Sequence, residues 1–369
     1  MARFTSLSAV FVATISILII VSSSTNNHHY LSELQRLATN IFTAKSTNIT
    51  NSNKTNTATT ASTIANIASS EIPMLSTAKN TAKNMSKSLL HAKITPHRSS
   101  TRGHSDHGWL NTYHSFSFAD WYDPRFNNFG SLRVLNEDRV KANSGFPTHP
   151  HRDFEIFSYL LGGELTHRDS MLAKGKEGGQ SDKFFRMHRG DVQFTTGGTG
   201  IAHSEFNEHK SDTVHFLQIW AVPWKRGLAP RYHTRHFDEE SKRQAFVPIL
   251  SPLKGGEEAT AQQEKDAEAV IPDTIPIHAD FVMAAGLIAP DKKFEWIAGG
   301  NATTDTKRKV FVHVAMCKGG KAKIRLDGRE DAELSEGDGA FIEGINAGDK
   351  LAVESIGEVE AEVVVLDTA

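Results

Sequence analysis

The sequence predicts an all-β protein whose first folded part is an antiparallel sandwich or barrel of the jelly-roll type. Between residues 101 and 250, short β-rich runs recur between turn-forming residues: Leu132–Asn136, Glu155–Leu161, Glu164–Asp169, Val192–Thr196 and His215–Trp220. No segment of this region keeps a helical apolar period over three turns. Many short strands at this spacing are typical of antiparallel sandwiches and barrels.

The β pattern resumes in residues 251–369 and predicts a second barrel there. A polar stretch at 254–268 is expected to form an exposed loop or a short helix. The apolar runs that follow it are Phe281–Ile288, Lys309–Met316, Lys321–Leu326, Asp338–Ile342, Lys350–Ser355 and Glu360–Leu366. No pair of closely spaced metal ligands recurs in this half, and His313 has apolar neighbours. We therefore expect a barrel without metal, packed against the first as a structural partner.

Before the first barrel, the sequence predicts two segments outside any packed core. Residues 1–23 combine a basic start, an apolar run at 9–21 and small residues after it, which is typical of a secretory signal peptide. A poorly ordered apolar leader is the alternative, and the run is too short for a stable membrane span. Residues 24–100 are rich in Ser, Thr and Asn, which predicts a disordered tail or an organelle transit segment.

These segments indicate entry into the secretory pathway, with onward transport to an organelle such as a plastid as one route. The alternative location is the cytoplasm or the nucleus.

The charge of the folded part argues against nucleic acid as a partner. Beyond residue 100 the chain has 41 acidic and 32 basic residues. An acidic body disfavours direct, phosphate-driven binding of nucleic acid. The single cysteine, Cys317, cannot form an intramolecular disulfide.

Two pairs of candidate metal ligands lie in different predicted strands. His149 and His151 are two residues apart, and so are His203 and Glu205. Because successive side chains alternate between the faces of a strand, the members of each pair point the same way. On neighbouring strands, the two pairs would form a metal site with four ligands.

Three imidazoles and one carboxylate suit iron, manganese, nickel, cobalt, copper or zinc, and they leave positions open for a substrate or dioxygen. The alternative is that some of the eighteen histidines come together by chance, as we expect for His104 and His107 on the surface. Both candidate pairs are embedded in Gly- and Pro-rich turn sequences at the edge of a strand. This setting favours the metal site.

The residues around both pairs resemble known motifs. The spacing of His149, His151, Glu155 and Gly162 resembles the first cupin motif, and Gly200, His203 and Asn207 resemble the end of the second. Three longer segments closely resemble the pirin family of two-domain cupins: residues 108–130, 149–163 and 190–207. Residues 215–220 and 226–237 resemble its bacterial quercetinase branch. The resemblance covers residues 101–369 and is weak beyond about residue 240.

This resemblance implies two cupin barrels and a metal-dependent dioxygenase. In the pirin family the ligands fall on the positions matched by His149, His151, His203 and Glu205, whereas Glu155 is not a ligand. It implies one divalent metal ion, for which Fe(II) is the first candidate. The activity implied is that of a quercetin 2,3-dioxygenase-like oxidoreductase, which opens the central ring of flavonols with O2. Glu205, as the acid among the ligands, is the candidate general base.

Two other functions stay open at this point. Some pirins resemble iron-binding regulators that interact with a transcription factor, so a non-enzymatic regulatory or interaction protein is the main alternative. A metal-free structural or storage cupin is the other. The partners expected of the enzyme are a small aromatic substrate of the flavonol class and O2. The oligomeric state stays open, and a monomer is compatible with the sequence.

Overall fold

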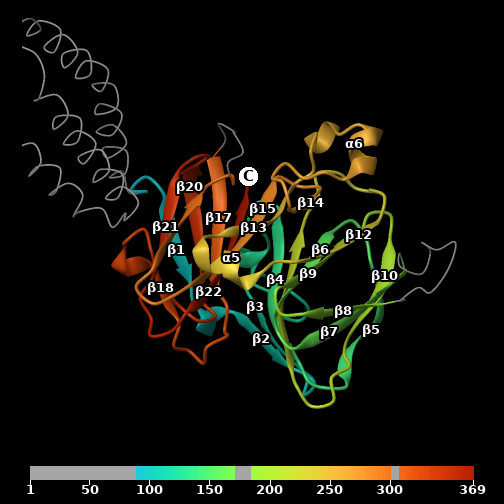
Figure 1. Cartoon of the computed structure of the whole chain (residues 1–369), viewed down its shortest axis with the longest axis horizontal. Coiled ribbons are helices and arrows are strands. Elements are labelled where there is room, and N and C mark those ends of the chain that lie inside the picture. Colours follow the sequence, from blue (N-terminus) through green and yellow to red (C-terminus); the bar gives the residue numbers. More distant parts are fainter. Residues whose placement is uncertain (1–88, 171–183, 301–306) are drawn as a thin grey trace, which may run out of the picture. The chain divides into compact units, whose positions relative to one another are not determined.

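The computed structural model describes residues 89–170, 184–300 and 307–369. The predicted leader at 1–23 and residues 24–88 of the predicted tail lie outside these ranges. The described part is almost entirely β-structure, as predicted, and is built as two cupin barrels (Figure 1). Each barrel combines one seven-stranded and one four-stranded sheet.

The first barrel contains the predicted strands of residues 101–250. Its larger sheet has the order β12-β9-β6-β11-β4-β3-β2, with β2 (Gly103–Asp106), β3 (Leu110–His114), β4 (Leu132–Val140), β6 (Glu155–Gly162), β9 (Asp191–Thr196), β11 (Val214–Ala221) and β12 (Arg231–His236). The smaller sheet has the order β5-β10-β7-β8, with β5 (Ser144–His151), β7 (Glu164–Asp169), β8 (Phe185–His188) and β10 (Ile201–Asn207).

The second barrel repeats this plan. Its larger sheet has the order β1-β20-β17-β22-β15-β13-β14, with β1 (Lys93–His97), β13 (Val247–Pro252), β14 (Ile275–Ile277), β15 (Phe281–Ile288), β17 (Lys307–Val314), β20 (Gly339–Asn346) and β22 (Ala361–Thr368). The smaller sheet has the order β16-β21-β18-β19, with β16 (Lys293–Ile297), β18 (Lys323–Leu326), β19 (Glu333–Ser335) and β21 (Lys350–Ser355).

The helices of the described residues are short. They are α5 (Glu239–Gln244), α6 (Ala261–Asp266) and the 3-10 helices η1 (Ser99–Thr101), η2 (Pro124–Phe126), η3 (Gly256–Glu258) and η4 (Glu330–Ala332). The helix α6 lies in the polar stretch at 254–268, where a capping box between Thr260 and Gln263 starts it. None of the helices in the described part could cross a lipid bilayer.

The two barrels pack through their larger sheets, whose central strands, such as β6, β15 and β22, are buried on both faces. In β6, Phe157 belongs to the apolar cluster that also contains Phe281 and Val364 of the second barrel. The next alternate residue, Tyr159, donates a 2.7 Å hydrogen bond to Glu362. Leu160 instead packs inside the first barrel. Alternation along one strand therefore divides its side chains between the interface and the barrel interior.

A buried polar network also joins the barrels. The carboxylate of Glu137 in β4 is fully buried and accepts hydrogen bonds from His215 Nε2 at 2.9 Å and from Arg102 Nη1 at 3.3 Å. From the second barrel it accepts from His313 Nε2 at 3.0 Å and from the backbone N–H of Met316 at 2.7 Å. His313 is thus buried at the interface between the two barrels.

Two of the expected segment boundaries are wrong. β1 lies inside the predicted tail at 24–100, where it pairs with β20 and so becomes an edge strand of the second barrel (Figure 1). β13 crosses the expected boundary at 250/251 and pairs with β15. Both corrections have one cause: the pairing partners are distant in sequence, and a polar flanking composition conceals a short strand.

We expect Ile94→Ala to destabilise the chain by about 2–4 kcal/mol, because Ile94 in β1 is 6% exposed and packs in the core of the second barrel. Thr95→Ala, on the exposed face of the same strand, should change stability by no more than about 0.5 kcal/mol. Urea unfolding of both variants measures this. Equal effects would show that β1 does not contribute to the core.

Candidate metal centre

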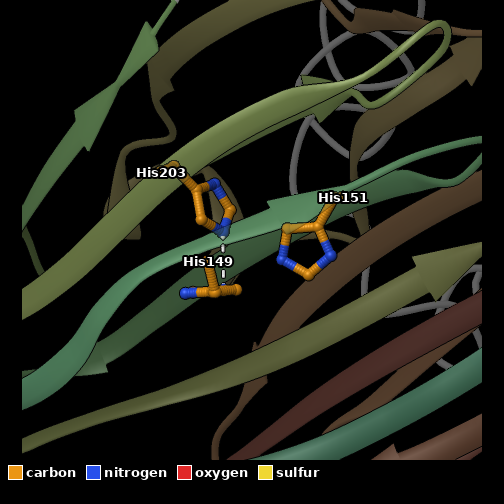
Figure 2. A group of neighbouring side chains, drawn as sticks. All are labelled: His149, His151 and His203. Atoms are coloured by element: carbon orange, nitrogen blue, oxygen red, sulfur yellow. Dashed lines mark hydrogen bonds between the residues drawn. The ribbon is translucent and has the colours of Figure 1, made fainter.

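The site is built on two strands of the smaller sheet in the first barrel. β5 and β10 pair antiparallel, and the register places His203 opposite His149. Figure 2 shows that the rings of His149, His151 and His203 turn toward one another. One nitrogen from each ring lies within 4.8 Å of one nitrogen from each of the others. The structure therefore gathers three of the four predicted ligands.

A hydrogen bond determines which nitrogen of His149 is available to a metal ion. Its Nδ1 lies 2.7 Å from the carbonyl oxygen of Pro147, which can only accept, so Nδ1 carries the hydrogen and Nε2 is left with a lone pair. This Nε2 lies 3.1 Å from Nε2 of His203. Two nitrogens at adjacent positions around one metal ion would be about 3 Å apart, for metal–nitrogen bonds of about 2.1 Å.

The charge state of His151 and His203 also fits a metal. Burial, assisted by neighbouring His149, lowers the pKa of His151 to about 4. Burial lowers the pKa of His203 much further below its ordinary value. Nε2 of His151 is buried and has no hydrogen-bond partner among the described residues. Neutral imidazoles with an unused lone pair are the form that binds transition metals, so the donor set fits a divalent ion.

The fourth predicted ligand, Glu205, is placed differently. Its carboxylate is 1% exposed and accepts hydrogen bonds from Ser158 Oγ at 3.2 Å and from Gln218 Nε2 at 3.1 Å. It lines the same cavity as His149 and His151 but is not part of the group of three imidazoles. Burial raises its pKa to about 7. Its role as a ligand stays a prediction.

The displacement of Glu205 has a local cause. Between His203 and Glu205 the pairing of β10 with β5 shifts, so that Glu205 lies opposite Phe146. The extra residue is on β5, next to Pro147, which has no N–H to contribute to the ladder. Strand alternation predicts which side chains of one strand lie on the same face. It does not predict a bulge in the partner strand, which changes the residues that lie opposite each other.

A cavity of about 340 Å³ opens beside the histidines. This volume lies within the range that accommodates small organic ligands. Apolar side chains form part of its wall, among them Leu110, Phe118, Phe146 and Trp220. His149, His151 and Glu205 lie on the polar part of the wall. The site thus combines an apolar wall with a small number of ligand and acid groups.

His167 in β7 is a site residue that the sequence analysis missed. Its Nε2 lies 3.0 Å from Nδ1 of His203, and β7 pairs with β10 on the side away from β5. Together with Asp169 and His203 it forms a second group of potential ligand atoms. A hydrogen bond between the two imidazoles fixes the ring of His203 and turns its Nε2 toward His149. The spacing of His167 and Asp169, again two residues, was the available signal.

Two cupin barrels with a histidine cluster in the first define the class of this protein. The family model for pirin matches residues 95–221. A solved structure of a bacterial pirin, YhhW from Escherichia coli in complex with nickel(II), superposes with a TM-score of 0.58 at 30% identity, over 75% of this chain and 99% of that one. The chain belongs to the pirin family.

Curated relatives carry a more specific name. A quercetin 2,3-dioxygenase from Escherichia coli K12 is 43% identical over 155 residues, which are 42% of this chain and 62% of the relative. A Pseudomonas aeruginosa protein, named provisionally as a quercetin 2,3-dioxygenase, is 40% identical over 194 residues, 53% of this chain and 72% of that protein. The match thus spans less than two thirds of the Escherichia coli relative.

Proposed function

We propose that this pirin is a metal-dependent dioxygenase that opens the central ring of flavonols such as quercetin with O2. One observation carries the proposal: three imidazoles meet beside a cavity of about 340 Å³ that a buried carboxyl group also lines. The names of the relatives support the reaction class. The flavonol and O2 together supply every atom of the products, a ring-opened ester and carbon monoxide.

The metal would be held by His149, His151 and His203, with Glu205 as the fourth ligand that the family resemblance implies. When bound, a divalent metal would lower the pKa of a flavonol hydroxyl group and draw its electron density toward dioxygen. Nickel is the ion in the related bacterial pirin, and the donor types here suit several divalent metals. Fe(II) remains the sequence-based prediction.

The protein's own side chains would bind and orient the substrate. Trp220 and Phe146, on the cavity wall, offer flat faces against which aromatic rings can pack. Glu205 would take the proton of the substrate hydroxyl, and the position of its carboxylate on the same wall as His149 and His151 supports this role. Ser158 and Gln218 hold this carboxylate in place through their hydrogen bonds.

The direct test is oxygen uptake and carbon monoxide release by the metal-loaded full chain with quercetin. We expect Glu205→Gln to lower the rate by about 100-fold or more, because the amide cannot accept the proton. Glu343→Gln, which changes a half-exposed carboxylate on β20, should retain the wild-type rate. Metal content is measured in each preparation, since Glu205 is also a predicted ligand. Metal-loaded wild-type protein that leaves a panel of flavonols unchanged would rule out the proposed function.

A further inference from the structure

One part of the cavity wall is polar and is not used by the proposed reaction. It is formed by β3 and β4, which pair in a register that places Thr112 opposite Asp138. Both side chains line the cavity. Between Asn136 and Asp138, which share the cavity face of β4, Glu137 points to the opposite face and meets His313. Strand alternation thus aims Asp138 into the cavity.

The carboxyl group of Asp138 lacks an expected partner. The side chain is 3% exposed, and its Oδ1 atom is buried without a hydrogen-bond partner in the described part of the chain. Oγ1 of Thr112 also has no partner within hydrogen-bonding geometry, although its hydroxyl is close enough to Asp138 to lower the pKa of that carboxyl group. Most buried polar groups in native proteins are hydrogen-bonded, so these two neighbouring atoms on the cavity wall offer a place where a polar group of a ligand can bind.

Two neighbouring polar side chains of the cavity wall, Asn136 and Gln218, do have partners. Asn136 Oδ1 lies 2.8 Å from Nδ1 of His114, and Gln218 donates to Glu205 at 3.1 Å. Burial raises the pKa of Asp138 to about 7, although the nearby Thr112 hydroxyl acts in the opposite direction. Both forms of the carboxyl group are therefore populated near neutral pH, and each can form a hydrogen bond with a hydroxyl group.

We propose that Asp138, assisted by Thr112, binds a hydroxyl group of the aromatic substrate other than the one at the histidines. Asp138 is then a specificity residue, and the site selects polyhydroxylated aromatic compounds over those that present a single hydroxyl. The inference rests on the proposed function for the identity of the test compounds. It extends that function by assigning a second polar contact on a different strand pair from the histidines.

The test compares quercetin with 3-hydroxyflavone, which has the same rings but lacks the other hydroxyl groups. For the metal-loaded wild-type chain, we expect kcat/KM for quercetin to be about tenfold higher, the effect of one good hydrogen bond. In Asp138→Leu this ratio should fall to about one. Asp138→Asn should keep most of it, because an amide still bonds to a hydroxyl.

Two further variants complete the design. Asp331→Leu removes an exposed carboxylate in η4 of the second barrel and should show the wild-type ratio. Thr112→Val keeps the shape of the side chain and should lower in part the ratio of kcat/KM for quercetin to that for 3-hydroxyflavone. This variant still tests the inference if Asp138→Leu fails to fold. A wild-type ratio near one, or a ratio that stays near tenfold in both Asp138→Leu and Thr112→Val, would overturn the inference.

The failure of the proposed function can be told apart from the failure of this inference. If metal-loaded protein turns over neither compound, the dioxygenase proposal fails. The ratio of the two dissociation constants, measured by quenching of tryptophan fluorescence with Trp220 on the cavity wall, then replaces kcat/KM. Tighter binding of quercetin that depends on Asp138 would still support the contact, and equal binding of both compounds would refute it.

Discussion

His151→Ala is expected to abolish metal binding at the concentrations that saturate the wild type, and with it the quercetin-dependent oxygen uptake. Nε2 of His151 is buried without a partner in the described part of the protein, and its ring centroid lies 4.7 Å from those of both His149 and His203. Loss of this imidazole removes one of three gathered nitrogen donors. The fall in metal affinity should exceed the roughly 10- to 100-fold that is typical of changes to outer partners.

Elemental analysis after dialysis against a metal buffer measures the expected result. The matched control is His188→Ala, because the His188 side chain in β8 is 63% exposed. This control should bind metal as the wild type does. A His151→Ala protein with unchanged metal content and unchanged affinity would show that the three-histidine cluster is not the metal site.

Glu137→Gln is expected to destabilise the protein at pH 7 by about 3–5 kcal/mol, the usual effect of breaking a buried ion pair. The variant leaves Arg102, whose side chain is fully buried, without its counter-charge. It also leaves the N–H donors of His215 and His313 facing a neutral amide. Urea unfolding measures the change. Glu295→Gln, which breaks a partly exposed pair with Lys350, should cost no more than about 1 kcal/mol.

The effect of Glu137 should depend on pH in one direction. Burial opposes its ionisation, but the hydrogen bonds from His215 and His313 and the charge of Arg102 outweigh burial and hold its pKa well below the ordinary value. A carboxylate with a lowered folded-state pKa stabilises the protein above its unfolded pKa of about 4.3, and this contribution is lost as the pH falls toward the folded value. The difference between wild type and Glu137→Gln should therefore be full at pH 7 and shrink below about pH 4. A difference that grows on acidification would contradict this account.

Much of the site could be predicted from local sequence. The two-residue spacing in His149/His151 predicts a shared strand face, and the register between β5 and β10 brings that face to His203. The same two-residue spacing in His167 and Asp169 also predicts a shared strand face, next to His203. Neither residue lies in a recognisable motif, so the spacing alone does not distinguish them from chance.

Other parts of the site depend on contacts that local patterns do not contain. The bulge beside Pro147 sets where Glu205 lies relative to the histidines. That one oxygen of the Asp138 carboxyl group has no partner is visible only in the folded chain, where β3, β4 and β11 surround one cavity. Whether a buried carboxyl group has a partner depends on every element packed around it.

The sequence by itself determined the all-β class, most of the strands and the faces on which the histidine pairs lie, because alternation is a property of neighbouring residues. Only the tertiary structure decided that β1 joins the second barrel through pairing with β20. It also decided that Glu137 connects the two barrels and that Asp138 faces the cavity. These features depend on pairing between strands far apart in the chain, and the free energy of that pairing comes from burial and hydrogen bonds formed only after folding.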